Sequence, residues 1–144
     1  MYIKITNGVV GLYSIYQLKL DNPTTSFPAN LTEELLAGYN VHSCTQAKMP
    51  PYDDLTEDCD PNEFVKGATG YIREWIITNK PMEEAERNIR SRRDGLLQDT
   101  DWIVIKSYER SANIPAEWEL YRQALRDITV QTNFPYSVVW PTKP

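Results

Sequence analysis

Residues 115–128 read PAEWELYRQALRDI, and this stretch decides the expected architecture of the C-terminal half of the chain. Pro115 suits the first turn of a helix, where a missing N–H costs nothing. Trp118, Tyr121 and Leu125 then recur at spacings of three and four residues, which places them on one face of that helix. The sequence therefore predicts an amphipathic last helix with a partly aromatic face.

A second helix is expected ahead of it, from Pro81 to about Gln98. Acidic residues follow Pro81 directly, and they suit the positive end of a helix. The apolar stripe of this helix is narrow, so it should pack on another helix, on a partner, or on a second copy of the chain. Between the two helices, residues 99–105 are expected to form an extended or turn segment that displays Trp102. The tail over residues 134–140 is expected to be extended because prolines flank it.

The N-terminal part predicts β structure. Residues 2–6 and 9–13 read as two strands, and Asn7-Gly8 between them is a strong hairpin-turn signal. A short helix should begin at an Asn30 cap and end at Gly38. Three further strands are then expected, over residues 39–47, 64–65 and 71–78. The segment 53–63 holds six acids and no base, which predicts a solvated loop.

The fold class that follows is α+β, with a small β-rich N-terminal domain (residues 1–80) and a helical C-terminal extension (residues 81–144). A length of 144 residues suits one domain, or a small domain plus an extension.

The net charge of −5 opposes general attraction to nucleic acid. The sequence shows no signal peptide and no apolar run that could span a bilayer, so we expect synthesis in the cytosol, no membrane partner, and two thiols at Cys44 and Cys59.

The sequence contains little that would indicate a catalytic or metal-binding site. His42 stands beside Ser43 and Cys44, but catalytic pairs are normally assembled by the fold rather than by adjacency. Structural zinc needs about four Cys or His ligands, more than the chain offers. Asp58 and Asp60 alternate as in a calcium loop, yet the required glycine and final glutamate are missing. We expect no catalytic residue, no metal and no cofactor, and intrahelical ion pairs rather than phosphate contacts for the arginines of residues 87–93.

The aromatic series of the C-terminal half allows two interpretations. The rings can build a core, or a subset of them can anchor another polypeptide. Large aromatics and arginines are the residues that most often dominate protein interfaces. The candidate partner-binding residues are Trp102, Trp118, Tyr121, Arg122, Leu125, Arg126, Phe134 and Trp140.

Residues 93–144 also carry an ordered set of motifs. The set comprises Arg93, Leu96-Leu97, Thr100-Asp101-Trp102, Trp118, the run Tyr121 to Ile128, Phe134-Pro135 and Trp140-Pro141. In order and spacing it resembles the C-terminal region of bacteriophage tail assembly chaperone proteins, including those linked to tail fibres. The front of the chain is similar to many members through Asn7-Gly8-Val9, Asp21-Asn22-Pro23 and Ser26-Phe27-Pro28. One departure is Asp94-Gly95, which falls where the resemblance favours stronger helix formers.

The resemblance implies a non-enzymatic phage protein that helps a tail component, a fibre above all, to fold, trimerise or attach. Its partner would be a tail fibre protein, and it would act in the host bacterial cytoplasm. The alternative is a structural component of the virion tail, an adaptor that bridges fibre and baseplate protein.

Overall fold

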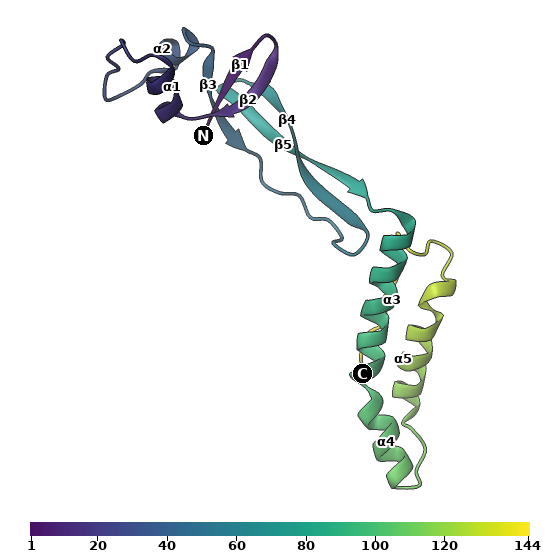
Figure 1. The fold of residues 1–144 in the computed structure, drawn as a ribbon. Helices are drawn as coiled ribbons and strands as arrows, with labels where there is room; N and C mark the ends of the chain where they lie inside the picture. Colours follow the sequence, from purple (N-terminus) through teal and green to yellow (C-terminus); the bar gives the residue numbers. More distant parts are fainter. The chain divides into compact units, whose positions relative to one another are not determined.

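The computed structural model describes residues 1–144 and has a five-stranded sheet in its N-terminal part and helices in its C-terminal half (Figure 1). This arrangement confirms the α+β fold class. The chain packs into two compact units. Residues 1–51 and 59–76 form the first, here called the sheet unit, and residues 52–58 and 77–144 form the second, the helical unit. The predicted domains, 1–80 and 81–144, stay a prediction.

The sheet unit opens with the predicted hairpin. Strand β1 (Tyr2–Thr6) pairs with β2 (Val9–Tyr13) in antiparallel register. Asn7 and Gly8 both have positive φ, 51° and 80°, as the twist of a tight hairpin turn demands. Local sequence therefore suffices to specify this element.

Two short helices and a third strand complete the packing on the hairpin. Helix α1 (Ile15–Asp21) and helix α2 (Glu33–Ala37) lead to β3 (Val41–Gln46), and the buried side chains of Leu18, Leu36 and Val41 form the core that joins them. The predicted Asn30 cap is wrong. The hydroxyl of Thr32 caps α2 instead, by accepting a hydrogen bond from the N–H of Leu35.

The sheet has the order β2-β1-β3-β5-β4, with β4 spanning Glu57–Gly67 and β5 spanning Gly70–Asn79. β3 and β5 are parallel, with Cys44 opposite Tyr71. The acidic segment predicted to be a loop is therefore strand from Glu57 onward. Its place at the edge of the sheet explains the difference, because an edge strand tolerates charges and even Pro61 on its open side.

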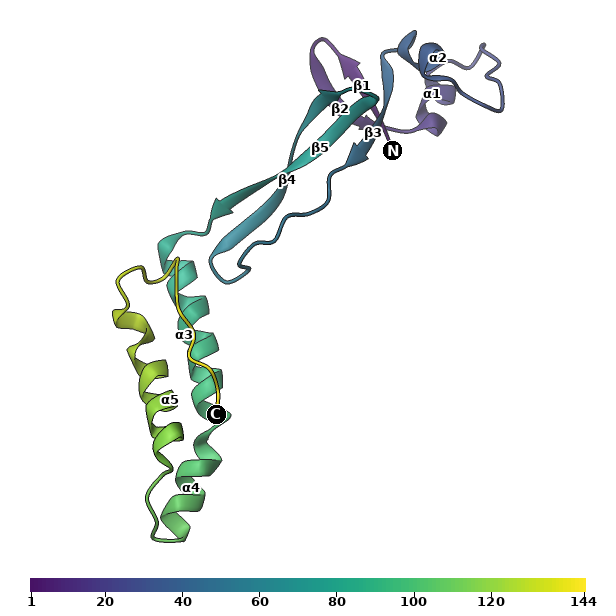
Figure 2. The same ribbon diagram turned by 180° about the vertical axis from the view of Figure 1, so that it is seen from behind.

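The helical unit contains α3 (Met82–Gln98), α4 (Asp101–Glu109), α5 (Ala116–Arg126) and a short 3-10 turn, η1 (Asp127–Val130). α3 and α5 lie side by side in both views, and the last residues of the chain run back along α3 (Figure 2). The predicted start and end of α3 and the predicted start of α5 are confirmed. None of the helices is long and apolar enough to cross a membrane.

Two expectations for this unit are wrong. Residues 101–109 form a helix rather than an extended segment, although β-branched residues fill positions 103–105. Burial of Ile103 and Ser107 on one side of α4 outweighs that local preference. Residues 132–136 are turns rather than extended chain, and the Phe134–Pro135 peptide bond is cis.

The segment 52–58 is held against the start of α3 by hydrogen bonds. The backbone N–H of Lys80 donates to the carbonyl of Thr56 (2.8 Å), and the side-chain amide of Asn88 donates to the carbonyl of Leu55 (2.9 Å). The ammonium of Lys80 also pairs with Asp58, and this hydrogen bond is the main reason that the pKa of Lys80 is raised. These contacts fix the N-terminal end of the helical unit.

Candidate partner-binding surface

The predicted partner-binding residues fall into groups that differ in exposure. Tyr121 is 5% exposed and Leu125 is fully buried, and both pack with Ile89 and Ile128 in the core of the helical unit. The helical face predicted from the sequence therefore exists, and it points inward against α3. In this arrangement these two side chains hold the helices together.

Arg122 also points inward, where it joins α5 to the junction of α3 and α4. Its guanidinium donates to the carbonyl of Leu97 (2.8 Å), to the hydroxyl of Thr100 and to the carboxylate of Asp101 (2.9 Å). Thr100 is fully buried, and its hydroxyl in turn donates to the carbonyl of Leu97 (2.8 Å). A single arginine thus satisfies groups left open where one helix ends and the next begins.

The rings of the C-terminal tail lie against arginines of α3. The guanidinium carbon of Arg90 lies 5.6 Å from the ring centroid of Phe134, and that of Arg92 lies 5.2 Å from the ring of Trp140. Both rings are half-buried and pack against the core. Arg90 also makes the predicted intrahelical ion pair, with Glu86 at 2.9 Å. The stacking on rings was not foreseen, because nothing in the local sequence indicates that the tail returns to α3.

A row of rings leads from this core to the surface. The ring of Tyr121 meets that of Trp118 edge-on at a centroid distance of 6.2 Å, and Trp118 meets Trp102 at 6.4 Å. Edge-to-face pairs at such distances are mutually favourable. Trp102 is 53% exposed, so the outer end of the row is open to contact.

Trp102 also begins an apolar stripe on α4. Ile105 and Tyr108 follow it at three-residue spacing, and they are 57% and 87% exposed. Neither residue was predicted as a binding residue from the sequence, because residues 99–105 were expected to be extended or turn rather than helix. One feature of the sequence does indicate a helix here: Asp101 precedes the apolar run, and an acidic residue is favourable in the first turn of a helix.

Trp102 and Trp118 line a groove between α4 and the beginning of α5, with a volume of about 280 Å³. Lys106 and Arg110 are the charged residues of its lining, which also includes Pro115. The ammonium of Lys106 lies 5.5 Å from the ring centroid of Trp102. The groove therefore combines aromatic walls with a cationic rim.

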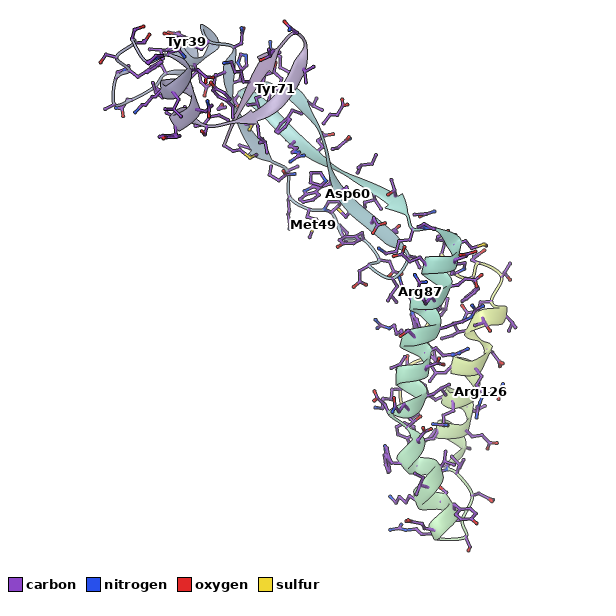
Figure 3. The ribbon with its side chains drawn as sticks, in the orientation of Figure 1. Tyr39, Met49, Asp60, Tyr71, Arg87 and Arg126 are labelled. Carbon is purple, nitrogen blue, oxygen red and sulfur yellow. The ribbon has the colours of Figure 1, made fainter.

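The remaining predicted residue, Arg126, is exposed on α5, and Arg87 occupies the first half of α3 (Figure 3). The roles of all eight residues in partner binding stay a prediction. What the structure brings together at an accessible place is Trp102, part of Trp118, and the unpredicted Ile105, Lys106 and Tyr108.

Residues considered for catalysis or metal binding lie elsewhere. The ring of His42 packs against that of Tyr71 at 5.2 Å in the sheet unit. Asp58 and Asp60 lie within strand β4, so they do not form a calcium loop. No group of three or more His, Cys, Asp or Glu side chains is placed to hold a metal ion, and no disulfide joins Cys44 to Cys59.

Comparison with known proteins gives a family match within the helical unit. Residues 86–144 match the family model described as "Phage tail assembly chaperone protein". The matched region covers most of α3, then α4, α5 and the returning tail, and it confirms the resemblance found in residues 93–144. Searches of curated protein sequences and of solved structures give no match to the chain.

Proposed function

We propose that this chain binds a tail fibre protein and assists its folding, trimerisation or attachment, because its residues 86–144 match the phage tail assembly chaperone family model. The family description already covers assembly of the tail. The proposal adds the fibre as the partner and the covering of its apolar surface as the mode of action.

One observation carries this proposal. Within the family region, helix α4 exposes Trp102, Ile105 and Tyr108 on consecutive turns, beside a groove lined by two tryptophans. Exposed apolar rows of this kind are typical of surfaces that hold another polypeptide. This row of side chains would cover a partner protein that exposes apolar surface at its ends before assembly.

The proposal includes no chemical step. Binding and release of a partner need complementary surface, and they do not need a nucleophile, a general base or a metal. We accordingly propose that the chain acts as a binding protein, without enzymatic activity, in the host bacterial cytoplasm while tails are assembled.

Co-expression with the tail fibre protein of the same phage tests this function. We expect the fibre protein to be soluble when the chain is present, to aggregate when it is omitted, and to co-purify with the full-length chain. A fibre that is equally soluble and equally trimeric without the chain, and that never co-purifies with it, would contradict the proposal.

A second candidate function rests on the sheet unit. The family match begins at residue 86, so the sheet and its own core of Leu18, Leu36 and Val41 lie outside it. An additional folded unit of this kind is expected of an adaptor that bridges fibre and baseplate protein in the virion. Quantitative mass spectrometry of purified particles separates the two candidates: a fixed, near-integral ratio to the fibre favours the adaptor, and loss of the chain from mature particles favours the chaperone.

A further inference from the structure

The groove between α4 and α5 carries two positive charges that no ion pair within the chain neutralises. Lys106 and Arg110 are its only charged lining residues, and neither forms a salt bridge within the chain. The chain as a whole has a net charge of −5, so a cationic groove runs against its overall electrostatic balance.

Several other basic residues of the helical unit form ion pairs within the chain. Arg90 pairs with Glu86, Arg93 with Asp94, and Arg122 with Asp101. Lys106 and Arg110 instead stand four residues apart at the end of α4, a spacing at which like charges on a helix repel each other. The negative end of the helix offsets part of that repulsion. A favourable interaction with the end of the helix does not explain why both cations line the same aromatic groove.

The walls of the groove define the apolar part of its occupant. Trp102 and Trp118 present ring surface, and the exposure of Trp102 leaves that surface accessible. The volume of about 280 Å³ lies just below the range of small-molecule sites, which run from roughly 300 to 1,000 Å³. Such a space suits one or two side chains of a polypeptide better than a cofactor.

We propose that this groove binds a segment of the tail protein in which a large apolar side chain lies next to an Asp or Glu. The apolar side chain packs against the accessible ring surface of Trp102 and Trp118, and the carboxylate pairs with Lys106 and Arg110. This assignment rests on the proposed chaperone function and adds the chemistry of the recognised segment. It also gives Lys106 and Arg110 the acidic partner that neither has within the chain.

The test uses the full-length chain and an array of short overlapping peptides that covers the tail proteins of the phage. We expect bound peptides to be enriched in Phe, Leu, Ile or Trp adjacent to Asp or Glu. Replacing the acid by its amide in the best peptide should weaken binding about three- to tenfold, as expected for one or two partly exposed ion pairs.

Variants of the chain separate the two parts of the site. Lys106→Gln with Arg110→Gln should remove the preference for the acid and flatten the dependence of binding on salt, and Trp102→Ser should abolish binding. Matched controls are Arg87→Gln, an exposed cation on α3, and Leu120→Ser, a 72% exposed residue of α5, and both should bind as the unmodified chain does.

Several results would overturn the inference. They are absence of any bound peptide, binding without preference for an acid, and a preference that survives the loss of both cations. A dimer of the chain in sedimentation experiments that Trp102→Ser dissociates would assign the groove to a second copy instead. Co-purification with the fibre protein despite any of these results would leave the proposed function intact, so the two failures are distinguishable.

Discussion

The guanidinium of Arg122 on α5 donates a hydrogen bond to the main-chain carbonyl of Leu97 at the end of α3, at a distance of 2.8 Å. The same side chain reaches Thr100 and Asp101, so it spans the break between α3 and α4. A charged residue that the sequence suggested as a partner contact thus makes the contacts that close the helical unit.

Arg122→Ala should destabilise the helical unit by about 2–3 kcal/mol, because it removes a largely buried charged donor to the Thr100 hydroxyl, one of the donors to the Leu97 carbonyl, and the ion pair with Asp101. Arg122→Lys should recover less than half of this loss, since an ammonium cannot reach several acceptors in fixed geometry as a guanidinium does. Urea unfolding followed by the helical circular dichroism signal measures both. Arg126→Ala, an exposed neighbour on α5, is the control and should change stability by less than about 0.5 kcal/mol.

Tyr121→Ala should cost about 3 kcal/mol or more, because the ring is 5% exposed and packs on Ile89 and Leu125. Trp118→Ala should cost a similar amount through the ring contacts on either side of it, reduced by its partial exposure. Thermal unfolding of the purified variants measures the effect. Unchanged melting together with lost fibre solubility would place these rings on the partner surface instead.

Trp102→Ala should separate stability from function. The side chain is 53% exposed, so its loss should lower the free energy of unfolding by no more than about 1 kcal/mol. Co-purification with the fibre protein should fall sharply, since exposed rings next to a groove are typical interface anchors. Leu120→Ala, which changes a more exposed apolar residue of α5, should affect neither measurement. A fully retained complex with Trp102→Ala would contradict the placement of the partner at α4.

The hydroxyl of Tyr13 donates to the carboxylate of Asp21, and this contact is the main reason that the pKa of Asp21 is lowered. A carboxyl whose folded pKa lies below its unfolded value stabilises the fold above the unfolded pKa, and this contribution is lost as the pH falls through the folded pKa. Tyr13→Phe should therefore raise the pKa of Asp21 and reduce the acid sensitivity of the sheet unit. Carboxyl carbon NMR titration measures the shift, with Tyr16→Phe, at an exposed tyrosine, as the control. An identical Asp21 titration in the Tyr13 variant would show that the hydroxyl is not the cause.

Gly70 occupies a position that other residues cannot adopt easily. Its φ is +136°, and a Cβ atom there would lie 2.9 Å from both the main-chain and the side-chain oxygen of Ser43. Gly70→Ala should destabilise the sheet unit by about 1–3 kcal/mol and loosen the parallel pairing of β3 with β5. Amide hydrogen exchange across residues 41–46 and 70–79 reports the loss. Gly11→Ala, where a Cβ meets nothing within 4 Å, is the matched control and should leave exchange unchanged.

Elements fixed by short-range signals could be predicted from the sequence. The Asn7-Gly8 turn specifies the first hairpin, Pro81 and the acids after it begin α3, and the spacing of Tyr121 and Leu125 defines the buried face of α5. Each depends on backbone geometry or on periodicity within a few residues. The motif order of residues 93–144 likewise predicted the family match over residues 86–144, because recognising it requires no knowledge of contacts.

Only the tertiary structure decided the features that depend on distant neighbours. β4 is a strand because β5 pairs with it, although its acids suggest a loop, and α4 is a helix because Ile103 is buried. The inward direction of Arg122 and the meeting of Trp102 with Trp118 arise from the return of α5 along α3, which no local pattern encodes. Packing free energy comes from residues far apart in the chain, so it can override local preference, and here it determines which residues of the C-terminal region remain available to a partner.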